Sequence, residues 1–344
     1  MVEFKAVTTL IGRLSYIIIG SSSTVLNTIL VLAMVRGRVH AQNPCLLLLM
    51  ALVLADVIMS AGLFLSGVVN ILVDYKLIKP EGFTQHECLG IYLLYSCGAP
   101  FGQLMTLMLA FERFLAVTFP VIYRKYSGRF NYVIVALVGS FSVTLAGFSY
   151  MDANSTGRVP LCGTVFAYSS RYNLVHTYLV RMTSSFAAIA MYLVVLLKIR
   201  YQVKISASMT QGSDTGAQGK KQNEATKTVT KLICIFFLTT VMAYIIILLE
   251  RIPAVVADPM VLNTLSLTVG SLLILNPFLN VFLLVRNPTI RESVHQICPW
   301  LVSITGGFEN DGISQTQKSN SQPGYTNNTL VKSAGAKSNW TTHA

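Results

Sequence analysis

Seven long apolar runs constrain this chain of 344 residues more than any other feature. Each run has 18 residues or more, and five of the seven contain no Asp, Glu, Lys or Arg. A helix needs about 20 mainly apolar residues to cross a hydrocarbon core roughly 30 Å thick, so each run is long enough to span a bilayer. The predicted crossings are 14–35, 45–73, 88–110, 130–151, 172–197, 232–249 and 259–285.

These crossings must be helices, because backbone groups in lipid have no water to bond and a β-barrel would show short segments of alternating polarity instead. Only 12% of the residues are charged, which is about half the usual share in soluble domains. The sequence therefore predicts an all-α fold, a seven-transmembrane helix bundle. No A-x-A-like cleavage site accompanies the first run, so we expect it to be retained rather than removed as a signal peptide.

The basic residues of the loops indicate the orientation. Leaving aside Arg113 and the tail after residue 300, the loops after the first, third, fifth and seventh runs hold 14 Lys and Arg, against 7 in the amino-terminal segment and the other loops. The positive-inside rule then places the amino terminus outside and the carboxyl terminus in the cytoplasm. We expect residues 1–13 to be a short extracellular segment, 14–300 to be the membrane domain of a plasma-membrane protein, and 301–344 to be a disordered tail. Basic loops beside the bilayer explain the net charge of +12, and nothing indicates nucleic acid.

Cysteine positions divide between the two sides of the membrane. Cys88 and Cys162 both fall on the predicted outer side, where an oxidising compartment favours a disulfide that would hold the loop before the fifth run over the bundle. Cys298 falls on the cytoplasmic side, where it could be palmitoylated or be a free buried thiol. The other three cysteines lie inside runs and are interpreted as small core residues.

A motif after the third run points to a family. Residues 112–123 read Glu-Arg-Phe-Leu-Ala-Val-Thr-Phe-Pro-Val-Ile-Tyr, which resembles the E/D-R-Y/F motif and its A-V-x-x-P-x-x-Y continuation in rhodopsin-like G-protein-coupled receptors. The resemblance covers residues 14 to about 298. Further marks of that family fall in the expected runs: Asn27, Asp56, Cys88 at 25 residues before Arg113, and Asn276-Pro277.

The resemblance implies a site for a heterotrimeric G protein at the cytoplasmic mouth. Glu112 and Arg113 match the ion pair that opens on activation in the family, and Tyr123 belongs to the same coupling site. The alternative is an arginine that snorkels at a helix end beside an incidental neighbour.

The resemblance also implies an intramembrane polar cluster of Asn27, Asp56 and Asn276. Asp56 is ionisable and lies inside a membrane helix, where insertion scales give a cost of roughly 2.5–3.5 kcal/mol, so it needs a partner. We expect Asn27 and Asn276 to share it. In the family this cluster binds sodium. The alternative is that these residues only form hydrogen bonds that hold the helices together. Gly102 stands where many members carry a hydroxyl, which argues against sodium, so we expect no cofactor.

Departures from the family pattern indicate a subgroup. Asn280 replaces the tyrosine of N-P-x-x-Y, the fourth run has no tryptophan, the fifth has no proline, and the sixth lacks C-W-x-P. These marks are commonly absent from chemosensory branches, including odorant receptors and nematode chemoreceptors. Residues 286–291 resemble the odorant-receptor turn into a short eighth helix. We therefore expect a chemosensory, odorant-like receptor with a short cytoplasmic eighth helix.

Two absences narrow the ligand. Tyr95 stands where amine receptors place an aspartate, which disfavours a biogenic amine, and Gly270 stands where opsins place the retinal-binding lysine. The candidate pocket is mostly apolar with a few hydroxyls, which suits a small organic molecule. Its predicted walls on the third run are Tyr92, Tyr95, Ser96 and Ala99.

Arg181 is the one Lys or Arg within the seven runs. It lies roughly 14 Å along the helix from Tyr172, which is too deep to snorkel. One hypothesis is that Arg181 receives an anionic or strongly accepting group of the ligand. The other is that it bonds backbone carbonyls or a hydroxyl of the third or sixth helix. His176 lies five residues earlier, about 140° away around an α-helix, so we expect the two side chains not to share a face.

Other functions stay open as alternatives. These are a receptor for a peptide or lipid and, as a further alternative, a transporter in which Asp56 and Arg181 line a path. A transporter would show repeats and several intramembrane charges, which are absent. We expect no enzyme, because His176 has no second histidine within a run to work with. Asn154 begins an N-glycosylation acceptor on the predicted outer side, which could be occupied or not.

Overall fold

The computed structural model describes residues 2–38, 44–78, 83–153, 158–159, 162, 167–209, 239–247, 249 and 259–304. Five of its helices are long and apolar enough to cross a membrane: Leu10–Arg36, Leu46–Asp74, Leu93–Thr118, Gly128–Met151 and Arg171–Tyr201. A shorter apolar helix covers Thr268–Leu284. Most of the sixth predicted crossing lies outside the described residues.

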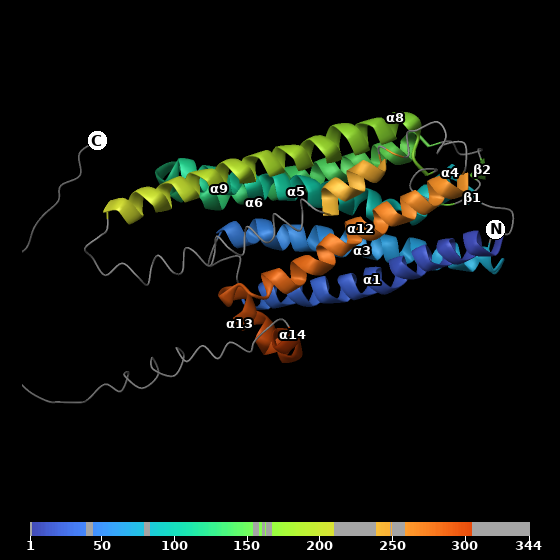
Figure 1. Cartoon of the computed structure of the whole chain (residues 1–344), viewed down its shortest axis with the longest axis horizontal. Coiled ribbons are helices and arrows are strands. Elements are labelled where there is room, and N and C mark those ends of the chain that lie inside the picture. Colours follow the sequence, from blue (N-terminus) through green and yellow to red (C-terminus); the bar gives the residue numbers. More distant parts are fainter. Residues whose placement is uncertain are drawn as a thin grey trace, which may run out of the picture. The chain divides into compact units, whose positions relative to one another are not determined.

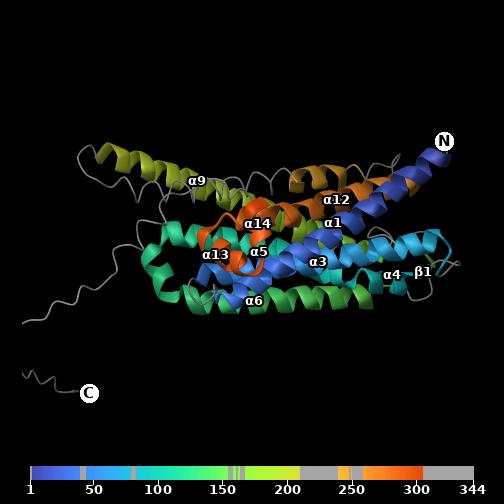
Figure 2. The ribbon, with the colours of Figure 1, turned by 90° about the horizontal axis from the view of Figure 1, so that it is seen from below.

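The long helices pack side by side, as Figures 1 and 2 show. α1 (Val2–Arg36) packs on α3 (Pro44–Asp74) and on α12 (Pro259–Leu284). α3 packs in turn on α5 (Leu93–Thr118), which contacts both α6 (Pro120–Met151) and α9 (Thr183–Met209). α5 is therefore the central helix of the described bundle.

Several helices extend past the apolar runs that predict them. α1 begins at Val2 rather than at residue 14, and α5 continues to Thr118 rather than ending at residue 110. α6 begins at Pro120, ten residues before its apolar run, because proline at the first helical position is already set to a helical φ. Apolar composition marks the part of a helix that lipid covers, so it does not mark where the helix itself ends.

The turns around α4 (Gln85–Ile91) follow from local sequence. Lys76 has φ of 56°, and the Leu77 and Lys76 amides donate to the Leu72 and Val73 carbonyls, which is a Schellman end for α3. α4 begins with a capping box, in which Thr84 Oγ1 accepts from the Glu87 amide at 3.3 Å and the Glu87 carboxylate accepts from the Thr84 amide at 3.0 Å. The third predicted crossing is therefore divided at Tyr92, where α4 ends and α5 begins.

The fifth crossing contains a π-helix. It begins as α8 (Ser170–Asn173), continues as η1 (Leu174–Met182), and becomes α-helical again as α9. A π-helix closes i→i+5 hydrogen bonds instead of i→i+4, and such segments occur often at functional sites. The sequence has no proline in this helix to mark the change.

Two short strands lie at the end of the bundle where α3 finishes (Figure 1). β1 (Phe83–Thr84) pairs antiparallel with β2 (Arg158–Val159). The predicted disulfide joins Cys88 to Cys162, with Cα atoms 5.4 Å apart. Asn154, the predicted glycosylation site, lies outside the described residues.

Two short helices, α13 (Pro288–Ile297) and α14 (Pro299–Ile304), follow α12 at the opposite end of the bundle (Figures 1 and 2). α13 packs against α1. Cys298, between the two helices, is a free cysteine and is buried in one apolar cluster with Leu30 and Val281. This burial favours the free thiol over palmitoylation, because an acylated sulfur must reach lipid.

Glycines allow α3 and α5 to approach closely. A Cβ added at Gly98 of α5 would lie 2.5 Å from the Met59 backbone nitrogen of α3. One added at Gly62 of α3 would collide with the backbone nitrogen of Tyr95. Small residues of this kind let helix backbones meet in membranes, where packing drives association.

Candidate functional site

The predicted coupling residues come together where α5 ends. Glu112 is fully buried, and its Oε2 lies 3.5 Å from Nε of Arg113, whose side chain is 45% exposed. The Tyr123 hydroxyl, from the first turn of α6, donates a hydrogen bond to Glu112 Oε1. The buried carboxylate therefore holds both of the other predicted residues, one on each oxygen.

The intramembrane polar cluster forms with a different partner for Asp56. The side chain that hydrogen-bonds to the Asp56 carboxylate is Asn280, not Asn27 or Asn276 as predicted. Asn27 Nδ2 instead donates to the Ser23 carbonyl at 2.9 Å and to the Pro277 carbonyl at 3.4 Å. Asn280 lies four residues after Asn276, one turn further along α12. In the sequence, Asn280 was noted only because it stands where the family has a tyrosine. Its contact with Asp56 was therefore not predicted.

Three oxygen atoms in this cluster have no hydrogen-bond partner in the described part of the chain: Asp56 Oδ2, Asn27 Oδ1 and Asn276 Oδ1. Carboxylate and amide oxygens are the ligand types that hard cations take, so these atoms fit the sodium that the family resemblance implies. A Cβ at Gly102 would lie 3.9 Å from Asp56 Oδ1. A serine or threonine here could place a hydroxyl beside this carboxylate, whereas glycine has none.

Replacing Asn280 with alanine tests the Asp56 contact. We expect Asn280→Ala to destabilise the protein by about 1–3 kcal/mol, because it leaves a buried carboxyl group without its hydrogen bond. Thermal unfolding of the purified chain would measure this. Asn276→Ala, one turn earlier on the same helix, is the matched control and should cost less. Equal losses in the two variants would contradict the assignment of Asn280 as the partner.

The predicted ligand residues of the third crossing are all buried near the end of the bundle that carries the disulfide. Tyr92, Tyr95, Ser96 and Ala99 are each at most 3% exposed. Ser96 Oγ lies 2.7 Å from the hydroxyl of Tyr168, and the rings of Tyr92 and Tyr95 meet edge to face. These side chains therefore belong to one aromatic cluster under the disulfide-linked loop.

His176 and Arg181 belong to the same cluster, although the sequence analysis expected their side chains on different faces of the helix. The His176 ring stacks on Tyr172 with centroids 5.2 Å apart and lies 5.5 Å from Tyr168. The prediction of separate faces was wrong because it assumed α-helical spacing. Leu174–Met182 is a π-helix, in which the i→i+5 hydrogen bond places residues five apart one turn above each other.

Arg181 is 5% exposed, and within the described part of the chain its Nη1 donates a hydrogen bond to the Tyr95 hydroxyl at 3.1 Å. Its guanidinium carbon lies 6.0 Å from the centroid of the same tyrosine ring, within the range of a cation–π contact. The guanidinium thus bonds a hydroxyl of the third crossing, as one hypothesis expected. Its Nε has no hydrogen-bond partner in the described residues.

A second polar contact joins three crossings below Arg181. Ser185 Oγ donates to Gln103 Oε1 at 2.7 Å and lies 2.9 Å from the Tyr244 hydroxyl. Ser185 belongs to α9, Gln103 to α5, and Tyr244 to the described part of the sixth crossing. None of the three was predicted, because serine, glutamine and tyrosine are ordinary residues in apolar runs.

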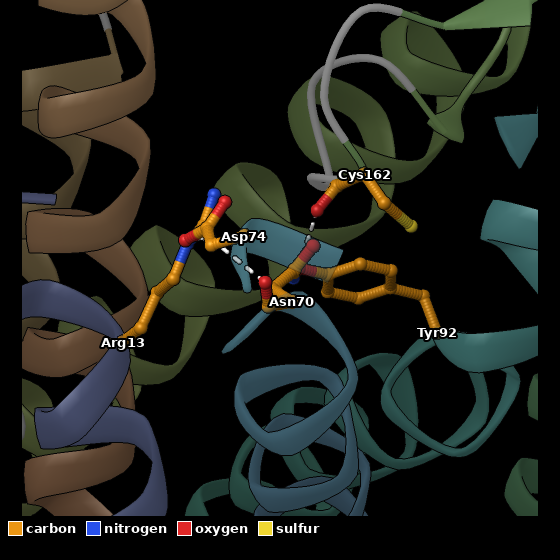
Figure 3. A network of polar contacts seen from close by, with 5 residues as sticks. All are labelled: Arg13, Asn70, Asp74, Tyr92 and Cys162. Atoms are coloured by element: carbon orange, nitrogen blue, oxygen red, sulfur yellow. Dashed lines mark hydrogen bonds and ion pairs between the residues drawn. The ribbon is translucent and has the colours of Figure 1, made fainter. Parts of the chain in front are cut away.

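An ion pair ties α1 to α3 beside the loop. Arg13, which the sequence placed in the extracellular segment, is 4% exposed and pairs with Asp74. Figure 3 shows Arg13 Nη1 reaching the Asn70 carbonyl, at 2.9 Å, and the Tyr92 hydroxyl donating to the Cys162 carbonyl, at 3.5 Å. The network therefore links two helices and Cys162 at the edge of the aromatic cluster.

Gly270 has no room for a side chain. A Cβ there would overlap the hydroxyl of Tyr16, a buried α1 residue.

Long apolar helices, an acidic residue and arginine paired at one end, and a disulfide-linked loop at the other define a multi-pass helical membrane protein of receptor type. The family model described as serpentine type 7TM GPCR chemoreceptor Srsx matches residues 18–298. The chain therefore belongs to this chemoreceptor family. No curated protein matches the chain.

Proposed function

We propose that this chemoreceptor binds a small molecule from outside the cell and activates a heterotrimeric G protein inside it. The amino terminus is extracellular and the carboxyl terminus cytoplasmic, in the plasma membrane. The observation that carries the proposal is the buried Glu112, which holds Arg113 and Tyr123 at one end of the bundle. The opposite end holds the aromatic cluster that includes Tyr95 and Arg181.

The geometry supports a mechanism with two states. Arg113 is partly exposed, so its bond to Glu112 is an ion pair that water can replace, whereas the Glu112 carboxylate is fully buried. In the state described here, Glu112 keeps Arg113 beside it and keeps α6 close through Tyr123. An agonist shifts the balance only if it binds the other state more tightly. In that state Arg113 leaves Glu112 and meets the G protein.

A small molecule suits the outer site better than a peptide. The predicted ligand residues are buried, and the described residues of the loop before the fifth crossing are held by the disulfide at Cys162 and by the β1–β2 pairing. A peptide would have to displace this loop. We therefore propose a small, odorant-like ligand and a chemosensory role.

Arg113→Ala tests the proposed function. We expect it to lower agonist-evoked G-protein activation at least tenfold, because the residue that contacts the G protein is lost, while surface expression stays near normal. The assay is G-protein activation in cells that express the chain, screened against a broad panel of volatile and water-soluble small molecules.

Arg171→Ala, an exposed arginine at the start of the fifth crossing, is the matched control and should respond like the wild type. Full activation by Arg113→Ala would contradict the assigned coupling site. Silence of the wild type with every class of G protein, at confirmed surface expression, would contradict the receptor function and favour transport.

A further inference from the structure

We propose that the ligand is a small organic anion whose carboxylate binds Arg181 and His176. The proposal rests on the proposed function, because it names the ligand class of the same outer site. It follows from charge and hydrogen bonding in the aromatic cluster.

The first argument is charge. Arg181 is buried, and its electrostatic neighbours in the described chain are tyrosines: Tyr95, Tyr168 and Tyr244. Burial raises the pKa of the Tyr168 hydroxyl well above its ordinary value near 10, so this phenol stays neutral. Asp56, the one acidic residue within the seven apolar runs, bonds to Asn280. Arg181 therefore has no anionic partner within the described protein.

A buried cation without a counter-ion is costly, and it is retained in membrane helices mainly where function needs it. A carboxylate that arrives with the ligand would supply the missing charge. The free-energy cost of burying Arg181 would then favour anionic over neutral ligands, because a neutral ligand of the same shape would not offset that cost.

The second argument is hydrogen bonding. Arg181 Nε and both ring nitrogens of His176 have no hydrogen-bond partner in the described residues, although His176 is fully buried. A neutral imidazole carries one N–H donor, and the Nε of arginine always carries one. The π-helix places these two donors one turn apart, and a carboxylate offers about four acceptor positions to receive them.

The surroundings define the rest of the ligand. Next to His176 lie the rings of Tyr168 and Tyr172. Aromatic faces suit an apolar body, so the expected ligand is a monocarboxylic acid with a short alkyl or aromatic body. An amine is disfavoured, because its ammonium group would lie beside a guanidinium.

A purely structural role for Arg181 makes the opposite prediction for stability. If Arg181 served only to bond Tyr95, its removal would destabilise the ligand-free protein. If it awaits a ligand anion, Arg181→Gln removes an uncompensated charge, and the melting temperature of the ligand-free protein should stay equal or rise by a few degrees.

The experiment measures thermal unfolding of the purified full chain in lipid nanodiscs. The probes are hexanoate, benzoate and phenylacetate at millimolar concentration, each compared with its primary amide, which has a similar shape but no charge. Ligand that binds only the folded state raises the melting temperature, whether or not a G protein couples. We expect at least one acid to raise it and the corresponding amide not to.

Variants assign the effect to the site. Arg181→Gln should abolish the acid-induced shift, Arg181→Lys should reduce it several-fold, and Arg171→Gln, at an exposed arginine, should leave it unchanged. Equal shifts with acids and amides, an acid-induced shift that persists in Arg181→Gln, or no shift with any acid would overturn the proposal. An acid-induced shift without G-protein activation would overturn the coupling function while leaving the anion site in place.

Discussion

Gly98→Val should remove nearly all folded protein from the cell surface. A Cβ at this position would lie 2.5 Å from the backbone nitrogen and 2.8 Å from the Cα of Met59, so neither atom can yield by rotating a side chain. α3 and α5 would have to separate along their contact. Overpacking a core usually costs about 1–3 kcal/mol, and a clash between two backbones belongs at or above the top of that range. Surface labelling of the tagged chain would measure the loss.

Gly147→Val is the matched control for this substitution. Gly147 lies on α6, where an added Cβ has no neighbour within 4 Å. The same change should therefore leave surface expression close to that of the wild type. Similar losses for both variants would show that valine itself is harmful in these helices and that the α3–α5 contact is not the cause.

Removal of the disulfide is the second large effect that we expect. Cys88 and Cys162 are 74 residues apart in sequence, so their bond closes a long loop that includes α5 and α6. Loss of a native disulfide typically costs about 2–4 kcal/mol, mainly through the unfolded state. Cys88→Ser and Cys162→Ser should each lower the melting temperature and the surface level, and the double variant should cost little more than either one.

The decisive measurement is whether the stability losses of the two single cysteine variants add in the double variant. Cys97→Ser, which changes a free cysteine of α5, serves as the control and should have little effect. If the two single losses simply add in the double variant, Cys88 and Cys162 act independently and the disulfide does not contribute as described.

Much of the fold follows from the sequence because its signals are local. Apolar runs predict where lipid covers the chain, and the Glu112-Arg113 motif predicts a contact between neighbouring residues that the structure contains. The Cys88–Cys162 bond was predictable because the predicted topology places both residues on the same side of the membrane. The helix ends were less predictable, since capping and proline set them outside the apolar runs.

The partners of buried charges were harder to predict, because they depend on how helices rotate against each other. Asp56 bonds Asn280 instead of Asn276, which differs by a single turn of α12. Arg13 lies next to the first apolar run and was counted with the extracellular residues, but α1 continues through it and brings it to Asp74. Composition does not contain this information, because it concerns contacts between residues far apart in the chain.

The π-helix of the fifth crossing also affects how this receptor can be compared with its relatives. Each π turn contains about one residue more than an α turn. Residues of Leu174–Met182 therefore do not occupy the same positions around the axis as residues with the same sequence spacing in an α-helix. A residue matched to another receptor by counting back from α9 towards Ser170 would then be assigned to the wrong side of the helix. Comparison of ligand contacts across this family therefore needs separate alignments for the two halves of this crossing, joined at Met182.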